Sequence, residues 1–252
     1  MQNILKILLA FLLMGSVAYA QKLPKVQASS VWAPANIKID GKTTEWDDQF
    51  QAHNLPNHIY YTLSNDDNNL YLTARMDDKQ GDTKIFKGGL TFTIILSAKK
   101  ADKISVTFPI ISKEKRAQME DGGGDRLIDS LTSSSKSELT NTYKEIYVTG
   151  IPGISNPFLS IYNTNGIRVG ASYDKKIRYT YELAIPLKYL ESAISDVKSI
   201  SYNIRLNAST IEAKNRVSSG PGMEITSLYP PDHSPLTNCL TLKIATFLVY
   251  IL

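Results

Sequence analysis

Residues 59–76 read IYYTLSNDDNNLYLTARM, two alternating runs joined by a cluster of Asn and Asp. Apolar residues stand at every second position from Ile59 to Leu63 and again from Leu70 to Met76. Successive side chains of a strand point to opposite faces of a sheet, so this alternation is typical of strands with one buried face. Asn and Asp side chains hydrogen-bond their own backbone in turns. The stretch therefore predicts a β-hairpin with its turn at residues 64–69.

The same period of two recurs along the chain. It is clear at residues 90–96, 104–110, 179–185 and 200–206, and weaker at 146–148, 159–161 and 167–169. Gly, Asn, Asp or Pro separate these runs, which together predict an all-β, antiparallel β-sandwich of the jelly-roll or immunoglobulin-like kind.

Helical pattern is scarce, and no linker or internal repeat divides the chain. Residues 187–191, which follow Pro186, and residues 112–119 predict two short helices. We expect residues 21–34 to form an N-terminal lead-in and residues 35–252 to form a single β-sandwich domain.

Composition excludes several classes of protein. The chain has 252 residues, with 28 Lys and Arg against 24 Asp and Glu, a formal net charge of +4. This mix excludes collagen-like, wholly disordered and disulfide-scaffold proteins. The positive charge is too small and too scattered to predict nucleic-acid binding. The single cysteine, Cys239, cannot form a disulfide within the chain.

The first twenty residues have the pattern of a secretory signal peptide. Lys6 precedes an apolar run at residues 7–14, and Ala18 and Ala20 are small residues at the −3 and −1 positions of a cleavage site. The apolar run is too short to span a membrane. We expect cleavage between Ala20 and Gln21, and a secreted or periplasmic protein that does not span the membrane afterwards.

Two segments depart from the strand pattern. Residues 113–142 are polar and contain three consecutive glycines, so we expect a long surface loop or disordered insertion there. The glycines lack the Lys-Ser/Thr ending of a phosphate-binding loop. Residues 239–252 are largely apolar but too few to cross a membrane, which favours a buried last strand.

Catalytic motifs are absent from the sequence. The three histidines, His53, His58 and His233, do not have the spacing of a zinc site. No Gly-x-Ser-x-Gly motif is present, and no pattern around Cys239 indicates an activated thiol. We therefore expect a protein that is not an enzyme and requires no cofactor.

The Asn/Asp turn has two interpretations. Calcium takes six to eight oxygen ligands, and Asp66, Asp67 and Asn69 could supply some of them, although their spacing is not that of an EF-hand. The interpretation as a hydrogen-bonded turn without metal is favoured by the turn preferences of these residues.

Aromatic residues are the remaining signal. A sugar presents C–H faces that pack on rings and hydroxyls that need polar partners, and Tyr and Trp offer an apolar body with a polar tip. For any Tyr in a strand, ordinary packing is the alternative. The candidate rings and donors are Trp32, Tyr71, Tyr202, Tyr229, Arg75 and Arg205, whereas Trp46 is expected in the core.

Three segments in order resemble the family 9 carbohydrate-binding modules, part of the wider group of DOMON-like sandwiches. They contain IKIDGK and EW in residues 37–46, NDDNNLYL and MDD in 65–78, and YELAIPL and YNIRLN in 181–207. The resemblance implies an antiparallel sandwich that binds sugars, exported alone or beside a glycoside hydrolase, and in some members with structural calcium.

The sequence departs from this family where sugar-binding members carry a stacking Trp followed by acids. Residues 84–92 read KIFKGGLTF, so Phe86 is the nearest ring, and Gly and Thr replace the acids. Tyr229 stands nearest to the family's second stacking ring. We therefore expect Phe86, Tyr229, Arg205 and Trp32 to form the sugar site of a non-catalytic module that serves polysaccharide recognition or catabolism and binds a poly- or oligosaccharide.

The alternative is an envelope sandwich without sugar affinity that binds a protein partner or, like some DOMON relatives, haem. Haem would need an axial ligand, for which Met76, His58 and His233 are the candidates.

Overall fold

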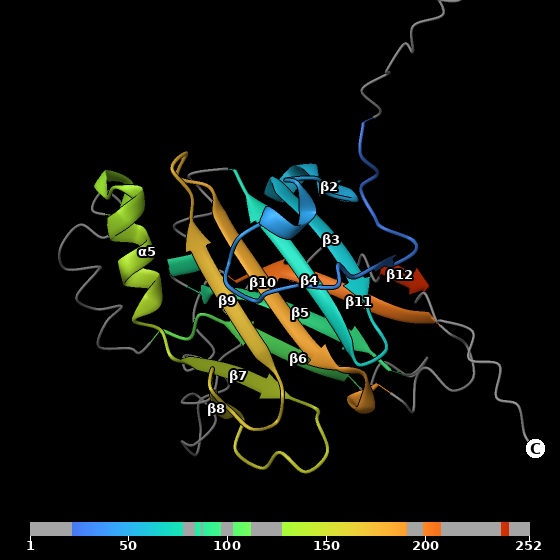
Figure 1. Cartoon of the computed structure of the whole chain (residues 1–252). Coiled ribbons are helices and arrows are strands. Elements are labelled where there is room, and N and C mark those ends of the chain that lie inside the picture. Colours follow the sequence, from blue (N-terminus) through green and yellow to red (C-terminus); the bar gives the residue numbers. More distant parts are fainter. Residues whose placement is uncertain are drawn as a thin grey trace, which may run out of the picture.

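The structure is a computed structural model that describes residues 22–77, 84–86, 88–96, 103–111, 128–190, 199–207 and 238–241. Two β-sheets pack face to face, with few short helices (Figure 1). This confirms the predicted all-β sandwich. The predicted signal peptide, residues 1–20, lies outside the described residues.

The first sheet has the strand order β1–β3–β4–β10–β9, and β2 also pairs with β3. Its pairs are antiparallel except for β1, which runs parallel to β3. The bounds are β1 Val31–Trp32, β2 Ala52–Asn54, β3 Ile59–Asn65, β4 Asn69–Met76, β9 Arg168–Tyr173 and β10 Tyr179–Pro186.

The predicted hairpin is confirmed as β3 and β4, which pair from Ile59 opposite Met76 to Asn65 opposite Leu70. Asp66 organises the turn, because its Oδ1 atom accepts hydrogen bonds from the backbone N–H groups of Asn68 and Asn69, both at 2.7 Å. The turn geometry thus comes from local side-chain to backbone bonds, as is usual for Asp.

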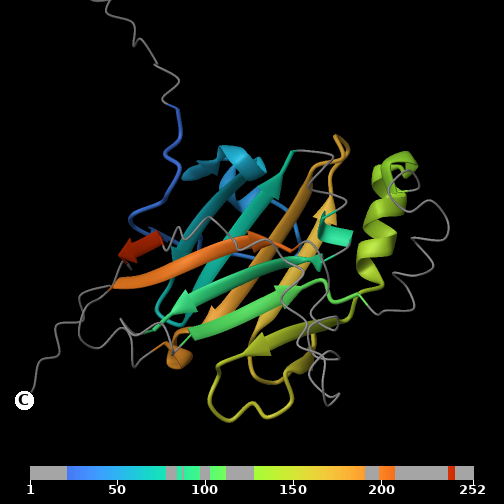
Figure 2. The same ribbon diagram turned by 180° about the vertical axis from the view of Figure 1, so that it is seen from behind.

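The second sheet has the order β12–β11–β5–β6–β7–β8, and every pair is antiparallel (Figure 2). Of the predicted last strand, residues 239–241 form part of β12, which pairs with β11, and residues 242–252 lie outside the described residues. The bounds are β5 Leu90–Ile95, β6 Lys103–Phe108, β7 Glu145–Thr149, β8 Phe158–Ser160, β11 Ser199–Leu206 and β12 Asn238–Thr241.

The described helices are short. They include the 3₁₀ helices η1 (Thr44–Trp46), η2 (Leu55–Asn57) and η3 (Leu187–Tyr189), and the α-helix α5 (Ser133–Asn141); residues 84–86 and 128–130 are also helical. η3 falls within the predicted helix at 187–191, and the predicted helix at 112–119 lies outside the described residues.

The α5 helix corrects the expectation of a polar loop throughout residues 113–142. Thr132 caps the helix by accepting a hydrogen bond from the Ser135 backbone N–H at 3.2 Å. The helix packs beside β9 at one end of the sandwich (Figure 1). Its buried residues are Lys136 and Thr140 rather than an apolar stripe, so the sequence has no helical hydrophobic period there.

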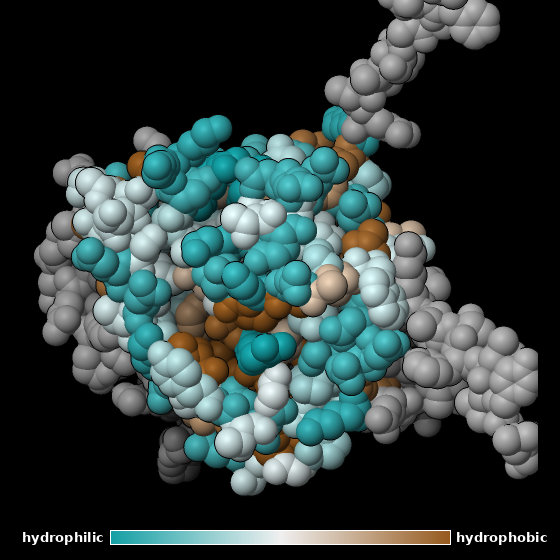
Figure 3. All heavy atoms as spheres, viewed as in Figure 1, coloured by the Kyte–Doolittle hydropathy of each residue, from teal (hydrophilic) through white to brown (hydrophobic). Residues whose placement is uncertain are grey.

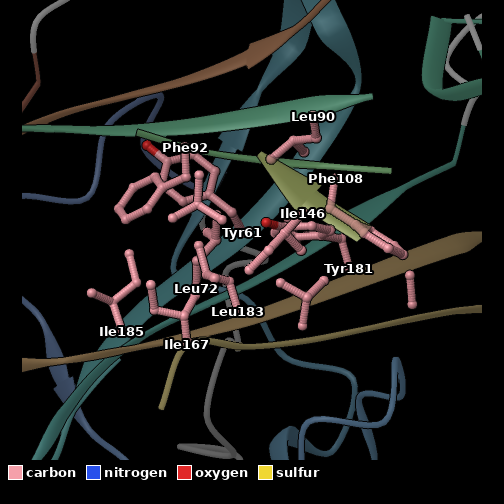
Figure 4. Packing of buried hydrophobic residues seen from close by; sticks show 14 of the residues in the cluster. Tyr61, Leu72, Leu90, Phe92, Phe108, Ile146, Ile167, Tyr181, Leu183 and Ile185 are labelled. Carbon is pink, nitrogen blue, oxygen red and sulfur yellow. The ribbon is translucent and has the colours of Figure 1, made fainter. Parts of the chain in front are cut away.

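The core lies between the two sheets. Tyr61, Leu72 and Leu183 of the first sheet point toward Phe92 and Ile146 of the second (Figure 4). These side chains are almost completely removed from water, and such burial stabilises the fold by about 25 cal/mol for each Å² of apolar surface.

A tyrosine pair also joins the sheets through hydrogen bonds. The hydroxyl of Tyr61 on β3 lies 2.9 Å from the hydroxyl of Tyr202 on β11. Tyr202 also donates to the backbone carbonyl of Gln27 at 3.2 Å. The polar ends of the two buried rings are thereby satisfied, as burial of a hydroxyl requires.

The lead-in covers the edge of β3 between β2 and β1. The Gln27 side chain accepts from the backbone N–H of Leu63 at 2.7 Å and donates to the carbonyl of the same residue at 2.7 Å. One side-chain amide therefore occupies the ladder position that a neighbouring strand would otherwise fill.

Residues 33–43, which we call the strap, cross the outer face of the first sheet (Figure 1). The backbone of the strap lies directly on β9, because a Cβ atom on Gly170 would lie 2.5 Å from the carbonyl oxygen of Ile39. Glycine at this position permits that close approach.

Candidate binding face

Phe86 is not an exposed ring. Its side chain is 0% exposed and stacks against Tyr173, with ring centroids 6.1 Å apart and planes 8° apart. Tyr143 packs on it as well. The sequence-based expectation of a stacking position at Phe86 is therefore corrected: the ring fills the core and offers no face to a sugar.

The other expected site residues are not brought together. Trp32, 45% exposed, lies on β1 of the first sheet, and Arg205 is exposed on β11 of the second. Tyr229 lies outside the described residues. The remaining candidates are buried: Tyr71, Tyr202 and Arg75. Trp46, expected in the core, is half-buried in η1.

At the turn, the carboxylate of Asp66 is already paired with donors of its own chain. Besides the two backbone bonds of its Oδ1 atom, its Oδ2 atom accepts the hydroxyl of Tyr71 at 2.7 Å. Burial and this carboxylate raise the pKa of Tyr71 to about 12. Asp67 is exposed and Asn69 half-buried. In the described part of the chain, no three His, Cys, Asp or Glu residues are grouped to hold a metal ion.

The haem-ligand candidates do not face a common space. Met76 is buried in the core between the sheets, whereas His58 is exposed at the end of η2. His233 lies outside the described residues.

The outer face of the second sheet carries a line of half-buried polar side chains across four adjacent strands. The hydroxyls of Thr93 and Ser105, in the middle of this line, are 2.9 Å apart and hydrogen-bond to each other. The line, which we call the polar row, consists of Asn203 on β11, Thr93 on β5, Ser105 on β6 and Thr149 on β7.

The next row on this face begins with the exposed Arg205 and ends with two rings. Across it lie Thr91 and Thr107, which are buried and hydrogen-bonded to each other, and then Tyr147 and Phe158. The Tyr147 and Phe158 rings are half-buried and meet edge to face, with centroids 5.0 Å apart. The sheet thus presents a guanidinium at one end of the row and a ring pair at the other.

Arg205 is held in place by a neighbouring amide. Its Nε atom donates to Oδ1 of Asn207 at 3.1 Å, and Nδ2 of Asn207 donates to the carbonyl of Gly88 and to Oγ1 of Thr91 at 2.9 and 2.8 Å. Because Asn207 is buried and fixed by these bonds, it orients the exposed guanidinium.

The loop after β8 presents a further ring. Tyr162 is 74% exposed, and the ammonium of Lys144 lies 5.6 Å from its ring centroid. Asn163 ties the loop together by donating to the carbonyl of Ile167 at 2.8 Å and accepting from the N–H of Asn165 at 3.0 Å. The exposed ring therefore sits on a loop that is already ordered by its own hydrogen bonds.

Sequence reasoning identified Arg205 but not the rings of the same face and of the loop after β8. Tyr147 stands between Ile146 and Val148, so the alternation could have placed it on the outer face. Tyr162 lies in an irregular loop, where no periodicity distinguishes an exposed ring from a packed one.

A buried acid lies beneath the strap, on the opposite sheet. Glu182 on β10 is 0% exposed, and burial raises its pKa to about 7. Its Oε2 atom accepts the backbone N–H groups of Asp40 and Gly41 at 3.0 and 2.9 Å. This carboxyl is distant in the fold from the polar row, since the two lie on outer faces of different sheets.

Comparison of the sequence with protein-family models found no match, and comparison with curated proteins found no significant match. Among the residues that the structure describes, none of the helices is both long enough and apolar enough to cross a membrane.

Proposed function

We propose that the mature chain is an exported, non-catalytic sugar-binding β-sandwich, whose binding face is the outer face of the second sheet together with the Tyr162 loop. The observation that carries this proposal is the polar row, flanked by Arg205 and by the Tyr147–Phe158 ring pair. Hydroxyls, an amide and a guanidinium match sugar hydroxyls, and rings match the C–H faces of a sugar.

The size of the face favours an oligo- or polysaccharide over a monosaccharide. The polar row crosses four adjacent strands, which are three strand spacings, or about 14 Å. Each strand contributes one polar side chain, so successive sugar units would meet similar partners along the row.

The charge of the face supports binding without catalysis. The described strands of this sheet carry one carboxylate, Glu145. Glycoside cleavage generally uses a pair of carboxyl groups about 5–9.5 Å apart on either side of the scissile bond.

Titration calorimetry of the mature protein against a panel of soluble polysaccharides and their oligosaccharides tests the proposal. We expect binding of at least one glycan and roughly fivefold weaker binding for Tyr162→Ala, since an aromatic contact contributes about 1 kcal/mol. Arg205→Ala should weaken binding by a similar or larger factor. The matched control is Trp32→Ala, which removes an exposed ring from the other sheet and should leave affinity unchanged.

Loss of binding in Trp32→Ala with retention in Tyr162→Ala would move the site to the edge of the first sheet. Failure of every glycan to bind the wild-type protein would refute the sugar proposal itself. Export is tested separately, by N-terminal sequencing of the released protein, which should begin at Gln21.

A further inference from the structure

The strap is attached to the first sheet by apolar packing along part of its length. Ala33 of the strap forms a buried cluster with Tyr71 of β4 and Ala184 of β10, and Ile37 and Ile39 of the strap pack against this cluster. Figure 3 shows apolar surface gathered where the strap crosses β9 and β10, on a face that is otherwise largely hydrophilic. This contact involves few side chains, so the attachment of the strap depends also on its polar bonds.

Those polar bonds converge on Gly41. The hydroxyl of Ser172 donates to the Gly41 carbonyl at 2.6 Å, and the Gly41 N–H donates to Oε2 of Glu182. Asp40 donates its backbone N–H to the same oxygen. One carboxylate oxygen thus anchors two consecutive amides of the strap.

The second oxygen of the same carboxyl group has no such partner. Oε1 of Glu182 is buried, and none of the described residues hydrogen-bonds to it. A buried carboxylate is tolerated when both oxygens are solvated by donors, and an oxygen left without one disfavours the ionised form.

The charged groups around Glu182 offer it no compensating cation. Asp40 and Glu45, on the strap and in η1, are both acidic and disfavour its ionisation further. On the neighbouring strands, the residues opposite Glu182 are neutral: Thr73 on β4 and Gly170 on β9.

Two cations of this region are paired with other groups. The nearest guanidinium on β4, that of Arg75, is paired with Asp77 and Asp48. Lys42 of the strap is paired with Asp40. On β9, the Ser172 hydroxyl is bound to the strap and Arg168 is exposed.

We propose that Glu182 makes closure of the strap depend on a proton: the strap is closed over the first sheet when Glu182 is protonated, and opens more often when Glu182 is ionised. Opening lets water reach the carboxylate, which restores the solvation that Oε1 lacks in the closed form.

The direction of the pKa shift agrees with this geometry. The two strap amides favour the anion, but burial outweighs them and raises the pKa of Glu182 from 4.5 to about 7. A group that binds its proton more tightly in the closed form than in the open form favours opening as the pH rises between these two values. Over 7 − 4.5, or 2.5 pH units, the opening equilibrium changes on the order of 100-fold.

Amide hydrogen exchange of the full mature chain tests the proposal. The Asp40 and Gly41 amides are followed by NMR from pH 5 to pH 8.5, and their rates are divided by the intrinsic rates at each pH. We expect the protection of these two amides to fall on the order of 100-fold across the range. In Glu182→Gln, which keeps an acceptor but cannot ionise, protection should not vary with pH.

Two kinds of control keep the result specific. Ser172→Ala removes a strap bond without removing a titratable group, so it should lower protection at every pH and keep the wild-type pH dependence. Asp40→Asn and Glu45→Gln should move the midpoint to lower pH, because each removes a charge that raises the pKa of Glu182.

The wild-type protein also gives a direct readout that needs no variant. The amide chemical shifts of Asp40 and Gly41 should titrate with a midpoint near pH 7. Titration near pH 4.5, absence of a pH effect on wild-type protection, or wild-type pH dependence in Glu182→Gln would each overturn the proposal. Because these measurements concern the first sheet, their outcome is independent of glycan binding.

Discussion

Gly41→Ala should destabilise the protein much more than an alanine at an unconstrained glycine. Gly41 has φ of 77°, a backbone conformation that costs a residue with a Cβ atom roughly 1–2 kcal/mol. The added Cβ would also lie 2.4 Å from the carbonyl carbon of Ala171 and 2.5 Å from the nitrogen of Ser172. These are backbone atoms of β9, so they cannot rotate away as a flexible side chain could.

Overpacking against such atoms adds about 1–3 kcal/mol, which gives a total near 3 kcal/mol for Gly41→Ala. Gly153 is the matched control, because its φ is 83° but a Cβ atom there would meet nothing within 4 Å. Gly153→Ala should therefore lose only about 1 kcal/mol. Urea unfolding at equilibrium, followed by tyrosine fluorescence, measures both differences. Equal losses in the two variants would refute the argument that the strap lies directly on β9.

Two further predictions concern Glu182 and Phe86. Between about pH 4.5 and pH 7 the folded state binds more protons at Glu182 than the unfolded state. As the pH rises through this range, the free energy of unfolding of the wild-type protein should therefore fall by about 3 kcal/mol relative to that of Glu182→Gln. Urea unfolding at several pH values measures this difference. A difference that grows in the opposite direction would contradict the raised pKa. Phe86→Ala should lower the free energy of unfolding by about 3–5 kcal/mol, because Phe86 is a core ring. The folded variant should keep the proposed glycan affinity when measured by calorimetry. Loss of affinity with unchanged stability would instead place Phe86 in the glycan-binding site.

Alternation in the sequence was enough to predict the main strands, because the buried face of each strand is uniformly apolar. The runs beginning at Ile59, Leu70 and Tyr179 all lie in strands of the first sheet. Local chemistry also predicted the turn, since Asp66 bonds to residues only two and three positions away. Features of this kind depend on near neighbours, which the sequence displays directly.

Long-range contacts account for what the sequence did not reveal. Glu182 alternates with Tyr181 and Leu183, so its position predicts a solvent-facing side chain, and only a strap from about 140 residues earlier buries it. The α5 helix has no apolar period because it buries Lys136 and Thr140 against the rest of the fold. Neither fact can be read from a local pattern.

In the candidate site too, local pattern predicted some features, and long-range contacts determined others. The exposure of Arg205 follows from the alternation of β11, in which Tyr202 faces the core. Phe86 was placed by resemblance to a family whose stacking ring stands nearby, but its neighbours Tyr143 and Tyr173 enclose it here. A resemblance between short segments predicts the fold of the backbone more reliably than it predicts whether a given ring is exposed.

The Gln27 amide has a consequence for how copies of this protein behave at high concentration. An uncovered edge strand has unpaired N–H and C=O groups that can pair with a strand of another copy, which is a common route to aggregation. On this side of β3, the peptide groups of Leu63 are already occupied by a carboxamide, between the segments that pair with either end of the strand. The Gln27 side chain thus blocks this stretch of the β3 edge against pairing with a strand of another copy.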